Sequence, residues 1–145
     1  MRRIKLTVAY DGTDYCGWQI QPNGITIEEV LNKKLSKLTG ENIVIIGASR
    51  TDSGVHAMGN VAVFDTESPI PPERFSYALN QKLPDDIVIV KSEEVPSDWH
   101  PRYQDHIVKT YEYHILNTEV QDHTKINNTY FVSYKSVSYK HLCYK

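Results

Sequence analysis

The chain has 145 residues, of which 40% are hydrophobic and 23% charged, and its net charge is −2. These values predict a globular domain with an apolar core and argue against a disordered chain or a strongly basic nucleic-acid binder. They leave room for a locally basic face. No apolar stretch approaches the roughly 20 residues that span a bilayer, and Cys16 and Cys143 offer no disulfide framework, so we expect a protein of the reducing cytoplasm.

The first third of the chain predicts a strand, a helix and a second strand. Apolar residues alternate over residues 4–10, which is typical of a half-buried strand. Thr26 and Glu29 form a capping-box pattern, the apolar spacing after them predicts an amphipathic helix, and Gly40 is placed to end it. The apolar run within residues 42–47 predicts a buried second strand.

The next elements complete a recognisable order. A third strand is expected at residues 61–64, a second helix opens at Pro71, and a fourth strand follows at residues 87–90. The order β-α-β-β-α-β predicts an α+β fold of the ferredoxin-like or RRM-like type, with an antiparallel sheet and both helices on one face. Alternation over residues 109–116 predicts a fifth strand.

The composition of the last part of the chain differs from that of the rest. Residues Tyr130–Lys145 are rich in Tyr, Ser and Lys and carry no helical or packing pattern. We therefore expect one patterned domain over residues 1–118, followed by an irregular tail over residues 119–145.

The sequence lacks the motifs of several kinds of functional site. The six histidines make no zinc-type spacing with cysteines or carboxylates, and neither a Gly-rich phosphate loop nor a dinucleotide fingerprint occurs. Ser49 or Ser53 with His56 lacks the pattern of a nucleophile elbow. We expect no metal and no cofactor.

The stretch Gly-Ala-Ser-Arg-Thr-Asp-Ser-Gly-Val-His-Ala at residues 47–57 follows the second predicted strand. Asp52 before Ser-Gly could be an ordinary turn residue whose carboxylate bonds a nearby backbone N–H. It could instead be a carboxylate held up for nucleophilic or base chemistry, with Arg50 favouring its ionised form. The residues alone leave both interpretations open.

Two aromatic clusters follow. Residues 98–103 mix Trp, His, Arg and Tyr, which suits a surface that stacks bases and contacts phosphates, or else a wet loop with a buried Trp. Residues 109–113, Lys-Thr-Tyr-Glu-Tyr, suit a similar surface or a plain strand with alternating aromatics.

Taken together, these motifs resemble those of the tRNA pseudouridine synthase A family over roughly residues 1–118. The segments that carry the resemblance are residues 10–13, 15–19, 47–57, 80–84, 99–103 and 109–113. The string Arg-Thr-Asp-x-Gly-Val-His is the most specific of them. The resemblance implies a pseudouridine synthase N-terminal domain that, without a cofactor, isomerises uridine to pseudouridine in the anticodon arm of tRNA, at positions 38, 39 and 40.

The resemblance also assigns roles to individual residues. Asp52 would be the catalytic carboxylate that attacks the nucleoside, and Arg50 would pair with it and help to hold the target base out of the stack. Tyr111 would stack on the flipped uracil, and Arg102 would contact phosphate or order the Asp52 loop. Gly54 would allow the close backbone turn after Asp52.

Family members carry a second domain of similar architecture, work in the cytoplasm and are homodimers. The resemblance therefore implies that residues 119–145 are the truncated start of that second domain. The main hypothesis is an active tRNA uridine isomerase. The alternatives are a catalytically silent RNA-binding remnant of the same family and a ferredoxin-like protein that binds small molecules or partners.

Overall fold

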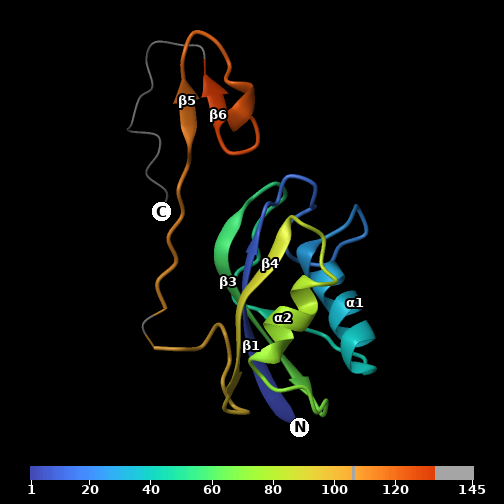
Figure 1. The fold of residues 1–145 in the computed structure, drawn as a ribbon. Coiled ribbons are helices and arrows are strands. Elements are labelled where there is room, and N and C mark those ends of the chain that lie inside the picture. The colour runs from blue at the N-terminus through green and yellow to red at the C-terminus, as the bar shows by residue number, and fades with distance from the viewer. Residues whose placement is uncertain (106, 133–145) are drawn as a thin grey trace. The chain divides into compact units, whose positions relative to one another are not determined.

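The computed structural model describes residues 1–105 and 107–132, and the chain divides into two compact units, Met1–Ile107 and Val108–Lys145 (Figure 1). The first unit contains β1 (Arg2–Tyr10), α1 (Ile27–Thr39), β2 (Ile46–Gly47), β3 (Ala57–Thr66), α2 (Arg74–Asn80) and β4 (Ile87–Val95). The second contains β5 (Ile115–Asn117), the 3-10 turn η1 (His123–Lys125) and β6 (Tyr130–Val132). Residues 133–145, about half of the predicted tail, lie outside the described residues, and the predicted domain boundary at residue 118 stays a prediction.

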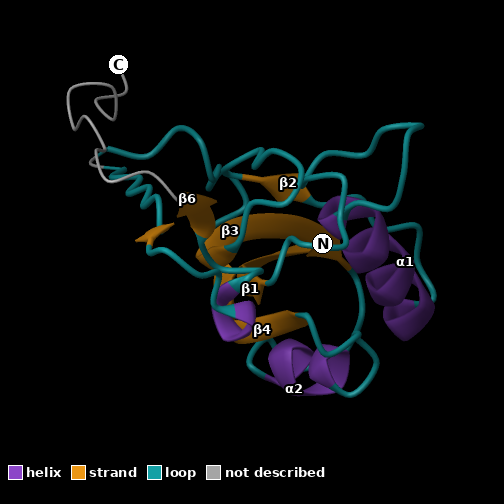
Figure 2. Ribbon diagram, turned by 90° about the horizontal axis from the view of Figure 1, so that it is seen from above, coloured by secondary structure: helices purple, strands orange, loops and turns teal. Residues whose placement is uncertain are grey.

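One antiparallel sheet organises the first unit. Its strands lie in the order β2-β3-β1-β4, with β1 central and paired to both β3 and β4. Figure 2 shows α1 and α2 on the same side of this sheet. The predicted α+β class, the antiparallel sheet and the placement of both helices on one face are confirmed.

The core lies between the sheet and the two helices. Ile4, Leu6 and Val8 alternate along β1 and are fully buried there, against Leu31 of α1 and Phe75 of α2. Their neighbours on β1 point to the other face and are half-buried. This period-2 pattern orients β1, and β1 in turn fixes the register of the strands beside it.

Both ends of α1 lie where the sequence predicts them, but only the Thr26 half of the capping box forms, because the Glu29 carboxylate pairs with Lys33 in the described part of the chain. The Thr26 hydroxyl accepts a hydrogen bond from the Glu29 backbone N–H at 3.3 Å, which satisfies one of the donors left open by the first turn. Gly40 adopts φ 76° at the other end, a left-handed conformation that costs glycine little.

The second predicted strand is much shorter than expected. The apolar run suggested a strand over residues 42–47, but β2 covers only two residues. Side chains of α1 take the backbone N–H groups that a longer strand would use: Ser36 Oγ accepts from Ile43 at 2.9 Å, and Asn32 Oδ1 accepts from Ile45 at 2.9 Å. Such helix-to-loop bonds compete with strand pairing and leave no trace in local periodicity.

The bounds of other strands and helices also differ from the predicted ones. Strands β3 and β4 run well beyond the predicted residues 61–64 and 87–90, because both pair with the nine-residue β1 along nearly its whole length. Helix α2 begins only at Arg74, after a turn at the prolines. Of the fifth strand predicted over residues 109–116, only the end forms as β5, which pairs in parallel with β6. Alternation marks a segment as amphipathic but does not supply a partner strand.

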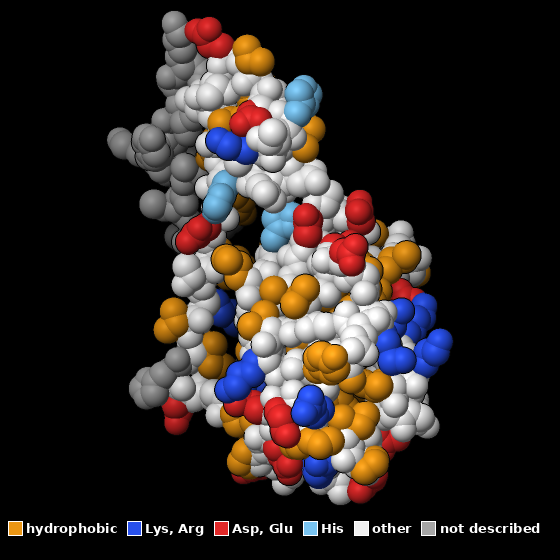
Figure 3. Space-filling model, in the orientation of Figure 1, with side chains coloured by type: hydrophobic (Ala, Val, Ile, Leu, Met, Phe, Trp, Pro, Cys, Tyr) orange, Lys and Arg blue, Asp and Glu red, His pale blue; other side chains and the backbone are white. Residues whose placement is uncertain are grey.

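None of the helices among the described residues combines the length and the apolar character that crossing a bilayer requires. The face of the molecule seen in Figure 3 carries both acidic and basic side chains, in keeping with the small net charge.

Candidate active site

The loop between β2 and β3 carries Asp52. Strand pairing ends with the bond from the Ala48 N–H to the Val61 carbonyl at 2.7 Å. The chain then turns back within four residues, where the Val55 N–H donates to the Asp52 carbonyl at 3.2 Å. Gly54 has φ 77° in this turn, so the predicted need for glycine at this position is confirmed.

The Asp52 side chain is exposed, and its carboxylate accepts no hydrogen bond from any residue in the described part of the chain. Asp11 and Asp122 behave differently, because each carboxylate accepts bonds from a threonine two residues on. Ordinary turn chemistry therefore occupies those two carboxylates and leaves the Asp52 carboxylate available for a ligand.

Arg50 lies on the same loop and is also exposed. Over residues 1–105 and 107–132 no ion pair joins Arg50 to Asp52, so the pairing expected from the resemblance is not formed in this structure. The roles of Arg50 and Asp52 in catalysis stay predictions.

A second loop, residues 11–18, packs against the Asp52 loop and is joined to it by backbone hydrogen bonds. The Trp18 N–H donates to the Thr51 carbonyl at 2.9 Å, and the Tyr15 carbonyl accepts from Gly54 N–H at 3.3 Å. Gly17 makes this approach possible, since it has φ 82° and a Cβ built on it would lie 2.7 Å from the Thr51 carbonyl oxygen. The sequence motif contains Gly17, but its neighbour in space could not be inferred from the sequence.

The two loops also meet at His56. The Gly12 N–H donates to His56 Nδ1 at 3.0 Å, and the Asp11 carboxylate lies 3.1 Å from the same nitrogen. Hydrogen bonds from Thr13, with a smaller contribution from His56, hold the pKa of the Asp11 carboxyl below its usual value. An ionised Asp11 therefore sits at the base of the Asp52 loop.

Arg102 contacts the start of the same loop. Its Nε donates to the Gly47 carbonyl at 2.8 Å, at the last residue of β2. The segment that carries Arg102 is fixed to β1, because the Arg3 guanidinium donates to the Trp99 carbonyl at 2.9 Å and Lys5 Nζ lies 5.4 Å from the centre of the Trp99 ring. Of the two expected roles for Arg102, ordering the loop is the one this contact supports.

Tyr111 belongs to the second unit, where its side chain is 65% exposed. Its expected stacking on the target base stays a prediction.

A pocket of about 410 Å³ opens beside Asp52. It is lined by residues 50–53 of the Asp52 loop and by Cys16, Gln19, Ile20 and Gln21. The glutamines were not singled out from the sequence as site residues, because only the fold shows that they line the same pocket as Asp52. Among the described residues no group of three His, Cys, Asp or Glu side chains could hold a metal ion.

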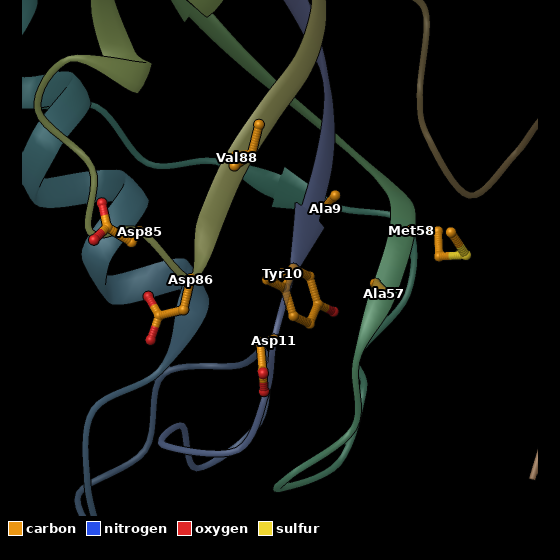
Figure 4. A pocket seen from close by; sticks show the side chains of 8 residues that line it. All are labelled: Ala9, Tyr10, Asp11, Ala57, Met58, Asp85, Asp86 and Val88. Carbon is orange, nitrogen blue, oxygen red and sulfur yellow. The ribbon is translucent and has the colours of Figure 1, made fainter. Parts of the chain in front are cut away.

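A second hollow of about 320 Å³ lies at the end of β1 (Figure 4). Three aspartates line it, at positions 11, 85 and 86, together with apolar residues that include Ala9 and Val88. Carboxylates at this density repel phosphate, so the hollow is a poor place for a nucleic-acid backbone. The pocket beside Asp52, with Arg50 on its wall, is the better candidate.

Comparison with known proteins agrees with the motifs. A family profile described as tRNA pseudouridine synthase matches residues 6–104. The chain is 58% identical over 118 residues to tRNA pseudouridine synthase A of Ruminiclostridium cellulolyticum, covering 81% of this chain and 48% of that protein. It is 51% identical over 135 residues to the protein of the same name from Acetivibrio thermocellus, covering 93% and 55%. The chain spans about half the length of the curated relatives it matches.

Proposed function

Since the chain belongs to the tRNA pseudouridine synthase family, we propose that it contributes the catalytic carboxylate for isomerising uridine to pseudouridine in tRNA. The observation that carries the proposal is the Asp52 carboxylate, which is exposed in a pocket and accepts no bond from the described part of the chain. Asp52, Arg50 and Arg102 all lie within the segment that the family profile matches.

The chemistry needs one nucleophile and no co-reactant. The Asp52 carboxylate attacks the nucleoside, and the bond between the ribose and the uracil nitrogen breaks. The detached uracil turns, and its carbon 5 bonds to the ribose carbon that the nitrogen has left, while the bond that the attack formed between that carbon and the Asp52 carboxylate breaks and frees the carboxylate. Carbon 5 then loses its proton while the former glycosidic nitrogen gains one, so the reaction is a balanced isomerisation.

The remaining groups serve binding and orientation. Arg50, on the wall of the pocket, helps to hold the base out of its stack, since a base inside a stem is unreachable. Tyr111 stacks on the flipped uracil, where its ring offers a flat face and its hydroxyl a polar end. Arg102 keeps the Asp52 loop in place through the Gly47 carbonyl.

The same proposal includes the target uridines, the type of fold, the location in the cell and the oligomeric state. The target uridines are those at positions 38, 39 and 40 of the anticodon arm. The fold of the first unit is the ferredoxin-like plan that RNA-recognition modules share, and its strand order and helix placement support this assignment. The protein acts in the cytoplasm as a homodimer.

The test is single-turnover release of tritium from tRNA that carries uridine labelled at carbon 5. The 145-residue chain is expected to release tritium, and Asp52→Asn is expected to slow release by at least about a thousandfold. Asp85→Asn is the matched control, because Asp85 is another exposed loop carboxylate of the first unit. Equal loss in both variants would contradict a specific role for Asp52.

A second candidate is a silent RNA-binding remnant of the same family. It is favoured by one observation, the lack of an ion pair between Arg50 and Asp52 in the described part of the chain. It predicts tRNA retention on a filter at low salt, no tritium release, and no effect of Asp52→Asn on retention.

A further inference from the structure

Asn60 is an unusual residue for its position in β3. It lies on the same face of the strand as Ala62 and Phe64, which belong to the apolar core, and it is only 7% exposed. A buried amide destabilises the fold unless its hydrogen bonds are made, whereas an apolar side chain would carry no such penalty. The bonds that Asn60 makes should therefore explain its presence.

The Asn60 side chain hydrogen-bonds the backbone at the point where the pairing between β2 and β3 stops. Its Oδ1 accepts from the Ser49 N–H at 3.2 Å, and its Nδ2 donates to the Ser49 carbonyl at 2.9 Å. The amide thus substitutes for a strand neighbour one residue after the last backbone bond, at Ala48. From Ser49 onward the chain leaves β3 and forms the Asp52 loop.

A chain of hydrogen bonds continues from Asn60 into the loop. Asn60 Nδ2 lies 3.4 Å from the Tyr10 hydroxyl, and that hydroxyl lies 2.6 Å from Thr51 Oγ1. Nδ2 donates in the first of these bonds, and in the second either hydroxyl can be the donor; together they connect Asn60 through Tyr10 to Thr51, the residue before Asp52. Figure 4 shows Tyr10 at the end of β1, in the space between β3 and β4.

We infer that Asn60 and Tyr10 are positioning residues for Asp52. Two buried side chains of central strands hold the residues at positions 49 and 51, and this fixes the backbone that presents the carboxylate to the pocket. The inference builds on the proposed role of Asp52, but its first test below needs no activity.

The first test is amide hydrogen exchange in Tyr10→Phe, which removes one oxygen and keeps the ring. The bonded amides of the loop, those of Ser49, Gly54 and Val55, are expected to exchange about fivefold faster, as the loss of one hydrogen bond would allow. Thr51→Val should give the same change, and the double variant should add nothing to it.

Tyr15→Phe is the matched control. Tyr15 is a second buried tyrosine near the loop, but its hydroxyl donates to Asp86 at 2.6 Å rather than to Thr51. Loss of the Tyr15 hydroxyl should leave the amides of Ser49 and Val55 unchanged, and the Gly54 amide is left out of this control because its partner is the Tyr15 carbonyl. Unchanged exchange in Tyr10→Phe, or faster exchange spread evenly over β1 and β3, would overturn the inference.

The second test separates positioning from binding in the isomerisation assay. Tyr10→Phe is expected to lower the single-turnover rate constant about tenfold while tRNA affinity stays within about twofold. Weaker binding with an unchanged rate would overturn the inference. If the unaltered chain releases no tritium, the proposed function fails, and the exchange comparison still decides whether Tyr10 positions the loop.

Discussion

Replacing Gly17 by Ala tests the packing of the two loops that form the site. Gly17 and Gly40 both have a left-handed backbone, with φ 82° and 76°. An alanine in that conformation costs about 1–2 kcal/mol at either position. At Gly40 nothing lies within 4 Å of the added Cβ, but at Gly17 the Cβ would meet the Thr51 carbonyl oxygen at 2.7 Å.

The clash at Gly17 causes a further loss of folding free energy that the substitution at Gly40 does not cause. The carbonyl of Thr51 has to move, and its bond from the Trp18 N–H, at 2.9 Å, is weakened or lost. Such a bond contributes about 0.5–1.5 kcal/mol. Gly17→Ala is therefore expected to lower the free energy of unfolding by about 1.5–3.5 kcal/mol, and Gly40→Ala by about 1–2 kcal/mol.

Urea unfolding of the 145-residue chain, followed by tryptophan fluorescence, measures both variants. Trp18 is a suitable probe because it is 1% exposed in the folded protein. An equal loss of stability in Gly17→Ala and Gly40→Ala would refute the reasoning, since the loop would then absorb the extra Cβ without cost.

Two further predictions concern the cap of α1 and the charges on β1 and β4. Thr26→Ala is expected to lower the free energy of unfolding by about 1 kcal/mol in the same urea assay, because the Glu29 N–H loses its partner, and Thr26→Ser should restore most of it. The bonds from Lys5 and Lys91 lower the pKa of Glu93 to about 2 from 4.5. Because the folded value is the lower one, this stabilisation is present above pH 4.5 and is lost as the pH falls toward 2. Glu93→Gln should therefore flatten the stability profile in that window, and an unchanged slope would contradict the assignment.

Local patterns predicted the elements whose causes are local. The helix α1 follows from its capping residues and apolar spacing, and β1 from strict alternation. The short β2 could not be foreseen, because Ser36 and Asn32 of the helix bond the amides of Ile43 and Ile45, which a longer strand would use. The same holds for the missing part of the fifth strand, since a strand requires a neighbour that periodicity does not identify.

The residues of the candidate site also fall into two groups, those that one local motif contains and those that only the fold brings together. Asp52, Arg50 and Gly54 stand in one short motif, so the sequence shows them together. The bond between Tyr10 and Thr51 joins residues that are 41 positions apart, and Gly17 meets Thr51 only after the fold has formed. Contacts of this kind depend on the register of the sheet, which the motif does not encode.

The most direct test of the account compares the 145-residue chain with Asp52→Ala on one unmodified tRNA, measuring binding and conversion of uridine to pseudouridine in the same samples. If Asp52 is the nucleophile, both proteins bind tRNA similarly, and pseudouridine is formed only by the chain that keeps Asp52. Pseudouridine formation by Asp52→Ala at an undiminished rate would contradict the claim that this carboxylate is the nucleophile.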